Sequence, residues 1–211
     1  MPTYFGNCKD IINWEEINAS LEGKEGWYDI SRPDDPITEE QLLAKTKSSL
    51  DEYFLANPEN KTQEYLNRIR TEADTVMSNW LNAGYKYKNI FWENFRTGDE
   101  LPESLATEFA KIVNAVPLRV FITRIVPGVT APWHYDVLPD YSEYGEVVRY
   151  LCFIHKAIPG QIIAFKDITF YNEDVGNIYK WDHTKQWHAA ANASLQPYNL
   201  FHFEGYKRNE D

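Results

Sequence analysis

The sequence predicts an α+β protein in which helices of the first half pack on an antiparallel jelly roll or small barrel formed by the second half. The apolar residues change from a helical period to short strand-like runs near residue 118. Turn residues separate these runs. No linker or low-complexity tract divides the 211 residues. We therefore expect a single domain, 1–211, with a mainly helical buttress over 1–117 and a jelly-roll core over 118–204.

Three amphipathic segments predict the helices. The first begins with a Thr-Glu-Glu-Gln capping box at 38–41 and ends before Pro58. The second places apolar residues at intervals of three and four over 65–81. The third lies between two prolines, over 103–116. Their apolar faces are typical of core packing, so we assign them no chemistry.

Short segments rich in β-branched and aromatic residues predict the strands of the second half. Two Pro-Gly turns, at 126–129 and 158–161, place a residue of fixed φ before one that tolerates positive φ, as a type II turn requires. Seven or eight short strands favour a jelly roll or small barrel. Residues 204–211 are expected to form a solvated tail. The expected strands are 118–126, 130–137, 147–155, 161–170, 177–182, 187–191 and 198–204.

The composition argues against several classes of partner. Acidic residues outnumber basic ones by 32 to 21, which gives a formal charge of -11 and disfavours nucleic acid. No apolar run of membrane-spanning length and no export signal occurs, so we expect a cytoplasmic protein without membrane contact. Only two cysteines are present, Cys8 and Cys152, which excludes a disulfide framework and a structural zinc finger. The oligomeric state stays open.

All five histidines fall in the predicted β half, where one pair of residues has the spacing of a metal site. His134 and Asp136 are two positions apart, so on a strand both side chains leave the same face. Together with an imidazole from a distant strand they would form a 2-His-1-carboxylate triad, which holds iron(II). For the second imidazole we favour His188, with His183 as the alternative. Taken alone, His-x-Asp also fits an ordinary strand.

These residues resemble the 2-oxoglutarate and iron(II)-dependent dioxygenases, whose double-stranded β-helix carries His-x-Asp on an early strand and a distal histidine on a late one. The resemblance covers about residues 118–204, and its local pattern is similar to the aspartyl/asparaginyl β-hydroxylase and prolyl-hydroxylase branches. It implies a cupin-like jelly roll with iron(II) held by His134, Asp136 and His188. It also implies that decarboxylation of the cosubstrate 2-oxoglutarate is coupled to hydroxylation of a small-molecule or peptide substrate.

The resemblance further requires a cation for the distal carboxylate of 2-oxoglutarate. Arg149 stands in a strongly apolar segment, where a regular strand would direct its guanidinium among core residues. Many relatives supply this arginine from the strand after the distal histidine, but residues 196–199 contain no base. Arg149 is therefore the main candidate, with Arg124, Thr123 and His155 as secondary ones. Without a metal site, Arg149 would equally fit a surface ion pair.

Two other hypotheses remain open from the sequence. One is a cupin-like metal enzyme that uses no 2-oxoacid. The other is a non-catalytic jelly-roll module that binds a ligand or a protein, with the histidines incidental. Binding of iron(II), with and without 2-oxoglutarate, separates the three.

Overall fold

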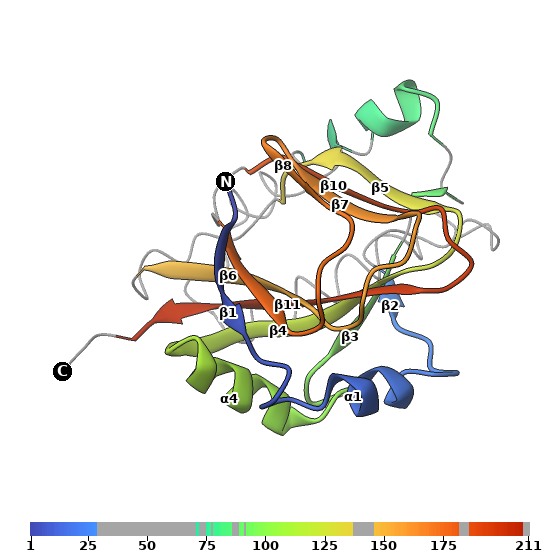
Figure 1. The fold of residues 1–211 in the computed structure, drawn as a ribbon. Helices are drawn as coiled ribbons and strands as arrows, with labels where there is room; N and C mark the ends of the chain where they lie inside the picture. The colour runs from blue at the N-terminus through green and yellow to red at the C-terminus, as the bar shows by residue number, and fades with distance from the viewer. Residues whose placement is uncertain are drawn as a thin grey trace.

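The chain forms an antiparallel, sheet-rich fold with few helices (Figure 1). Two sheets face each other, and helices α1 (Trp14–Ser20) and α4 (Glu103–Ile112) lie against the outer face of the larger one. No helix among the described residues is long and apolar enough to cross a membrane. The computed structural model describes residues 1–28, 71, 75–76, 78–85, 89–90, 92–136, 146–181 and 186–208.

Within the described part of the chain, the larger sheet has seven strands in the order β1-β9-β6-β11-β4-β3-β2, and the smaller has four in the order β5-β10-β7-β8. The larger sheet contains β1 (Thr3–Asn7), β2 (Trp27–Tyr28), β3 (Glu93–Arg96), β4 (Ala115–Ile125), β6 (Val147–Phe153), β9 (Asn177–Trp181) and β11 (Tyr198–Lys207). The smaller contains β5 (Val129–His134), β7 (Gln161–Phe165), β8 (Ile168–Phe170) and β10 (His188–Asn192). Each segment expected as a strand overlaps one of these strands, and 161–170 divides into the hairpin of β7 and β8.

The first half departs from the expected mainly helical segment over 1–117. Its described residues contribute β1, β2, β3 and the start of β4 to the larger sheet, besides α1 and α4. Strand β1 lies at the sheet edge and is largely exposed, and β2 has two residues, so neither carries the alternation that predicts a strand. Helix α4 agrees with the third expected helix, and residues 78–82 of the second are helical. The first expected helix, 38–57, lies outside the described residues.

Both faces of strand β6 are buried, and this explains its strongly apolar sequence. One core lies between the sheet and the helices, where Phe109 of α4 contacts Phe201 of β11 at a ring separation of 4.6 Å. The other core lies between the two sheets and includes Phe153 and Phe165. All seven residues of β6 are buried, and Arg149 is the charged residue among them. Because side chains alternate, Arg149 shares the inter-sheet face with Phe153.

The first Pro-Gly turn carries the chain from the larger sheet into the smaller one. Gly128 has a φ of 80°, and Val129 donates its backbone N–H to the Val126 carbonyl at 3.2 Å. This is the geometry expected of a type II turn, in which glycine tolerates the positive φ. The turn connects β4 to β5 and thereby places the end of β5 opposite the inter-sheet face of the larger sheet.

Candidate metal centre

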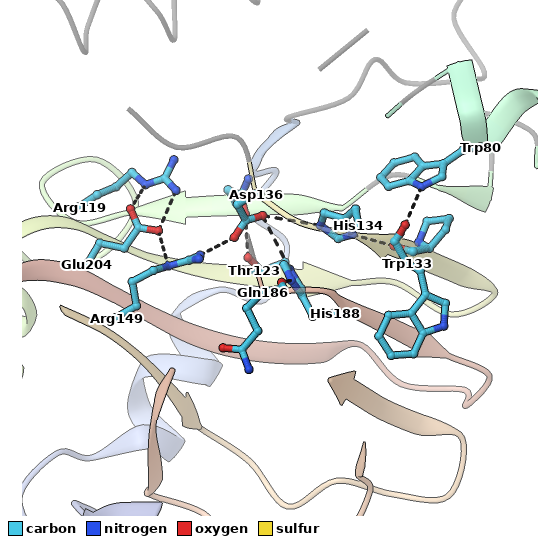
Figure 2. Close-up of polar contacts among 12 residues, drawn as sticks. Trp80, Arg119, Thr123, Trp133, His134, Asp136, Arg149, Gln186, His188 and Glu204 are labelled. Atoms are coloured by element: carbon cyan, nitrogen blue, oxygen red, sulfur yellow. Dashed lines mark hydrogen bonds and ion pairs between the residues drawn. The ribbon is translucent and has the colours of Figure 1, made fainter. Parts of the chain in front are cut away.

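Three side chains meet between the sheets, where β5 ends and β10 begins. His134 closes β5, His188 opens β10, and the two residues are paired across the strands. Asp136 follows two residues after His134, and its Oδ1 lies 3.6 Å from His134 Nε2 and 3.7 Å from His188 Nε2 (Figure 2). Separations of this size allow the three atoms to reach one ion through bonds of about 2.1 Å. The structure thus brings together the three residues that the sequence suggested as metal ligands.

Backbone carbonyls orient both imidazoles toward this point. His134 Nδ1 lies 2.6 Å from the Pro132 carbonyl oxygen, and His188 Nδ1 lies 3.0 Å from the Gln186 carbonyl oxygen. A carbonyl oxygen can only accept, so each Nδ1 carries a proton and donates it, and a metal would take Nε2. Each Nε2 is then the unprotonated nitrogen, with its lone pair available to a metal. This arrangement is typical of histidine ligands.

Aromatic rings hold each imidazole in place. His134 stacks on Trp92 with ring centroids 5.9 Å apart, and the edge of Trp80 meets it at 5.3 Å. His188 stacks on Phe165 at 5.8 Å. These rings restrict the rotation of the imidazoles and exclude water from one side of the site. Sequence analysis missed these rings, because Trp80 and Trp92 carry no local signal of proximity to a histidine far along the chain.

The charges at the site favour an ionised Asp136 carboxylate and a neutral His188 imidazole. Burial would raise the pKa of Asp136, but Arg149, His188 and His134 together with the hydrogen bond from Arg149 hold it well below its usual value. Burial lowers the pKa of His188 to about 4, against the opposing effect of Asp136. At neutral pH the carboxylate and His188 are therefore both in the protonation state that binds metal.

Arg149 is the buried cation of the site. Its side chain is 4% exposed, its Nη2 donates a hydrogen bond to Asp136 Oδ2, and its Nε forms an ion pair with Glu204 Oε1 at 3.1 Å. The guanidinium lies over the ring of Trp181, with Cζ 3.8 Å from the ring centroid. Its remaining nitrogen, Nη1, donates to no described residue, and Arg149 lines the cavity beside the three proposed ligands. Nη1 is therefore the part of the guanidinium that an incoming anion can contact.

A row of charged and aromatic side chains crosses four neighbouring strands of the larger sheet. Arg119 of β4 pairs with Glu204 of β11, Glu204 pairs with Arg149 of β6, and Arg149 pairs with Trp181 of β9. Arg119 binds Glu204 in a bidentate manner, with Nε–Oε2 at 2.9 Å and Nη2–Oε1 at 3.0 Å (Figure 2). Glu204 therefore holds the two guanidinium groups on either side of one carboxylate.

The three proposed ligands and Arg149 line a cavity of about 90 Å³ between the sheets. This volume is several times the space of roughly 10–15 Å³ that one water needs. Charged groups and apolar side chains such as Ile163 and Leu200 together form the wall of the cavity. The cavity can thus hold a small ligand beside the histidines.

Two secondary candidates from the sequence have structural partners. Arg124 donates to Glu93 at 3.2 Å and to the Leu21 carbonyl at 2.7 Å, and it does not line the cavity. The expectation that Arg124 contacts the cosubstrate is therefore wrong. Residues 119, 121, 123 and 125 face the cavity, and because side chains alternate along a strand, Arg124 faces away from it. Thr123 lines the cavity and donates to Asn94 Oδ1 at 2.9 Å.

The other histidines occupy different positions. His155 accepts the backbone N–H of Asn199 at Nε2, 2.9 Å away, and lies outside the cavity, so it is also corrected as a cosubstrate contact. His183 lies outside the described residues. His202, for which no role was expected from the sequence, lines the cavity.

Strand β11 supplies functional groups that sequence analysis missed. Glu204 was expected at the start of a solvated tail, but β11 continues to Lys207 and Glu204 is 1% exposed. On a strand, Leu200, His202 and Glu204 share one face, and this alternation was the available signal. The ion pairs of Glu204 could not be recognised from the sequence, because its partners Arg119 and Arg149 lie far away along the chain.

Comparisons with known proteins give weak structural similarities. No protein-family model matches the sequence, and no curated protein matches it. A collagen prolyl hydroxylase of Paramecium Bursaria Chlorella virus-1, solved with 2-oxoglutarate, has 14% identity and a TM-score of 0.41, over 65% of this chain and 90% of its own. A Pseudomonas putida prolyl-4-hydroxylase has 9% identity and a TM-score of 0.39, over 92% of this chain and 100% of its own.

A sugar phosphate isomerase of the cupin superfamily from Silicibacter pomeroyi has 10% identity and a TM-score of 0.33. The match covers 55% of this chain and 60% of the isomerase, so the chain spans less than two thirds of that protein. The similarities accordingly assign no activity to this chain.

Proposed function

We propose that this protein is a non-haem iron(II) oxygenase that couples decarboxylation of 2-oxoglutarate to hydroxylation of a small-molecule or peptide substrate. The observation that carries the proposal is the convergence of His134, Asp136 and His188 beside a buried arginine in one cavity. We further propose a jelly roll of the double-stranded β-helix type as its framework, and a cytoplasmic location.

The donor set fits iron(II). Two neutral imidazole nitrogens and one carboxylate oxygen form the facial triad that non-haem iron(II) oxygenases use. Both Nδ1 atoms already donate to backbone carbonyls, so the Nε2 atoms need no rearrangement of tautomer to bind a metal. A structural zinc site would be expected to provide four protein ligands, and the described residues gather three here.

The charge of the site fits a dianionic cosubstrate. The carboxylates of Asp136 and Glu204 balance the guanidinium groups of Arg119 and Arg149, so these four side chains carry no net charge. Iron(II) would bring a charge of +2, which the two carboxylates of 2-oxoglutarate would neutralise. Arg149 Nη1 can pair with the distal carboxylate while Nη2 stays on Asp136.

In this function, the residues of the chain bind and orient the metal and the cosubstrate and exclude water from the site. His134, Asp136 and His188 hold the metal, and Arg149 fixes the cosubstrate in the same cavity. Bound iron(II) supplies the oxygen chemistry, with 2-oxoglutarate as the source of two electrons. The rings that pack on the imidazoles keep bulk water away from the reacting atoms.

Anaerobic titration tests the proposal. The protein should show a visible charge-transfer band when both iron(II) and 2-oxoglutarate are present, and neither component alone should produce it. His134→Gln should abolish the band. Arg124→Gln, which removes an arginine outside the cavity, should retain it. Metal uptake without the band would favour a cupin-like enzyme that uses no 2-oxoacid, and a chain that takes up no metal would favour a non-catalytic module.

A further inference from the structure

His202 lies in the row of residues next to the charged row on the inter-sheet face. It pairs with Phe121 of β4 and Leu151 of β6, and Glu204 follows two positions later on the same face. Its ring stacks on Phe121 with centroids 4.9 Å apart and an interplanar angle of 8°. His202 lines the same cavity as Arg149. Stacking thus fixes the ring in the cavity that Arg149 also lines.

One nitrogen of this ring is available to a ligand. His202 makes no hydrogen bond to any described residue, and its Nδ1 is buried without a partner. Because the ring lines the cavity and Nδ1 is its buried nitrogen, Nε2 is the nitrogen that can face the cavity. A buried N–H without an acceptor costs free energy, and this favours the tautomer with the proton on Nε2. The ring then directs a donor into the cavity.

The His202 imidazole is neutral at neutral pH. Burial and, after it, the neighbouring Arg149 lower the pKa of His202 to about 3. Asp136 opposes this effect, while His188 and Arg119 add to it. A neutral donor next to a guanidinium contributes a hydrogen bond without adding a charge that an anion would have to balance.

We propose that His202 is a cosubstrate-binding residue whose Nε2–H donates a hydrogen bond to the carboxylate that Arg149 binds. This inference rests on the proposed function. It identifies β11 as a second wall of the carboxylate site, although the strand provides no arginine there. The site then recognises a carboxylate through one charged and one neutral donor, from β6 and β11.

The test measures binding of 2-oxoglutarate to the manganese(II)-loaded protein by calorimetry. His202→Leu removes the donor and should raise the dissociation constant about tenfold, which corresponds to the loss of one hydrogen bond to a charged group. His202→Gln retains an N–H donor and should stay within about threefold of the wild type. The affinity for manganese(II) alone should be the same in all three proteins.

A second ligand separates a specific contact from a general disturbance of the cavity. 2-Oxovalerate has the same chain length as 2-oxoglutarate without the distal carboxylate, so His202→Leu should leave its affinity unchanged. A similar loss for both ligands, or weaker binding of manganese(II), would show a structural role and overturn the inference. If His202→Leu does not fold, His202→Phe keeps the stacking on Phe121 and serves for the same comparison.

The inference and the proposed function fail in different ways. Wild-type protein that binds manganese(II) but no 2-oxoglutarate would overturn both. If the wild type binds 2-oxoglutarate and His202→Leu binds it equally tightly, only the role of His202 is overturned.

Discussion

Arg149 donates a hydrogen bond through Nη2 to Asp136, so the cation proposed for the cosubstrate is joined directly to a proposed ligand of the metal. The two carboxylate oxygens of Asp136 face in different directions: Oδ1 lies near the histidines and Oδ2 meets the guanidinium. Arg149 therefore lowers the pKa of this carboxyl and also fixes the direction of Oδ1. Metal affinity and cosubstrate affinity should consequently depend on the same side chain.

Substitution of Arg149 should weaken both kinds of binding. In Arg149→Gln the distal carboxylate of 2-oxoglutarate loses its cation, and we expect the dissociation constant to rise by about 100-fold or more. The Asp136 carboxylate loses its partner as well, so affinity for manganese(II) should fall by about tenfold, as for other outer contacts of metal ligands. Calorimetry with each ligand measures both effects.

Arg124→Gln is the matched control for this experiment. Arg124 belongs to the same sheet and pairs with the carboxylate of Glu93, but it does not line the cavity. Its removal should reduce stability and leave both dissociation constants unchanged. Equal losses in the two variants would mean that the effect of Arg149 arises from the net charge of the protein.

Removal of one imidazole should abolish metal binding while the fold is kept. His134 is 8% exposed and lies between Trp80 and Trp92, so alanine would leave a cavity among these rings. Glutamine fills more of this space, and His134→Gln should fold with an affinity for manganese(II) reduced by more than about 100-fold. His155→Gln changes a histidine outside the cavity and should bind manganese(II) as the wild type does. Undiminished binding in His134→Gln would remove His134 from the site.

The part of the site that could be predicted from the sequence is the part encoded over short distances. His134 and Asp136 share a face because they are two residues apart on one extended segment, and Arg149 is conspicuous as a charge within an apolar strand. The strands of the second half were predicted for the same reason, since each carries its own alternation and its own turn residues.

The remaining features depend on pairings between distant segments. Arg119 and Glu204 are 85 residues apart and meet because β4 and β11 are neighbours in the sheet. Neither residue has a local pattern that reveals the other. The exposed edge strand β1 also lacked a recognisable pattern, because alternation is expected of a strand with one buried and one exposed face.

The carboxylate of Glu204 should be coupled energetically to Arg119. Glu204→Gln leaves two guanidinium groups without the carboxylate between them, and we expect it to lower the free energy of unfolding by about 3 kcal/mol. Arg119 is partly exposed, so Arg119→Gln alone should cost about 1 kcal/mol. The double variant should lose at least about 1 kcal/mol less than the two single losses added together, since one of the opposed cations is gone. Urea denaturation of the four proteins measures this coupling, and strictly additive changes would contradict it.

Stability should fall on acidification, in part because of His202. Its pKa is lowered from 6.5 to about 3 in the folded state, so between these values the unfolded chain binds a proton that the folded protein does not. Unfolding is therefore favoured as the pH falls through this window, with a slope of at most about 1.4 kcal/mol per pH unit from this residue. His188, whose pKa is lowered to about 4, contributes in the same direction.

The variant His202→Gln isolates the contribution of His202, because glutamine does not titrate. Its free energy of unfolding, measured by urea denaturation without added metal, should decrease less steeply than that of the wild type between pH 6.5 and 4. Above pH 7 the two proteins should show parallel pH dependence, since the histidine is neutral in both the folded and the unfolded chain. Identical slopes at acidic pH would mean that His202 is accessible to protons in the folded state, and its ring would then not be held neutral beside Arg149.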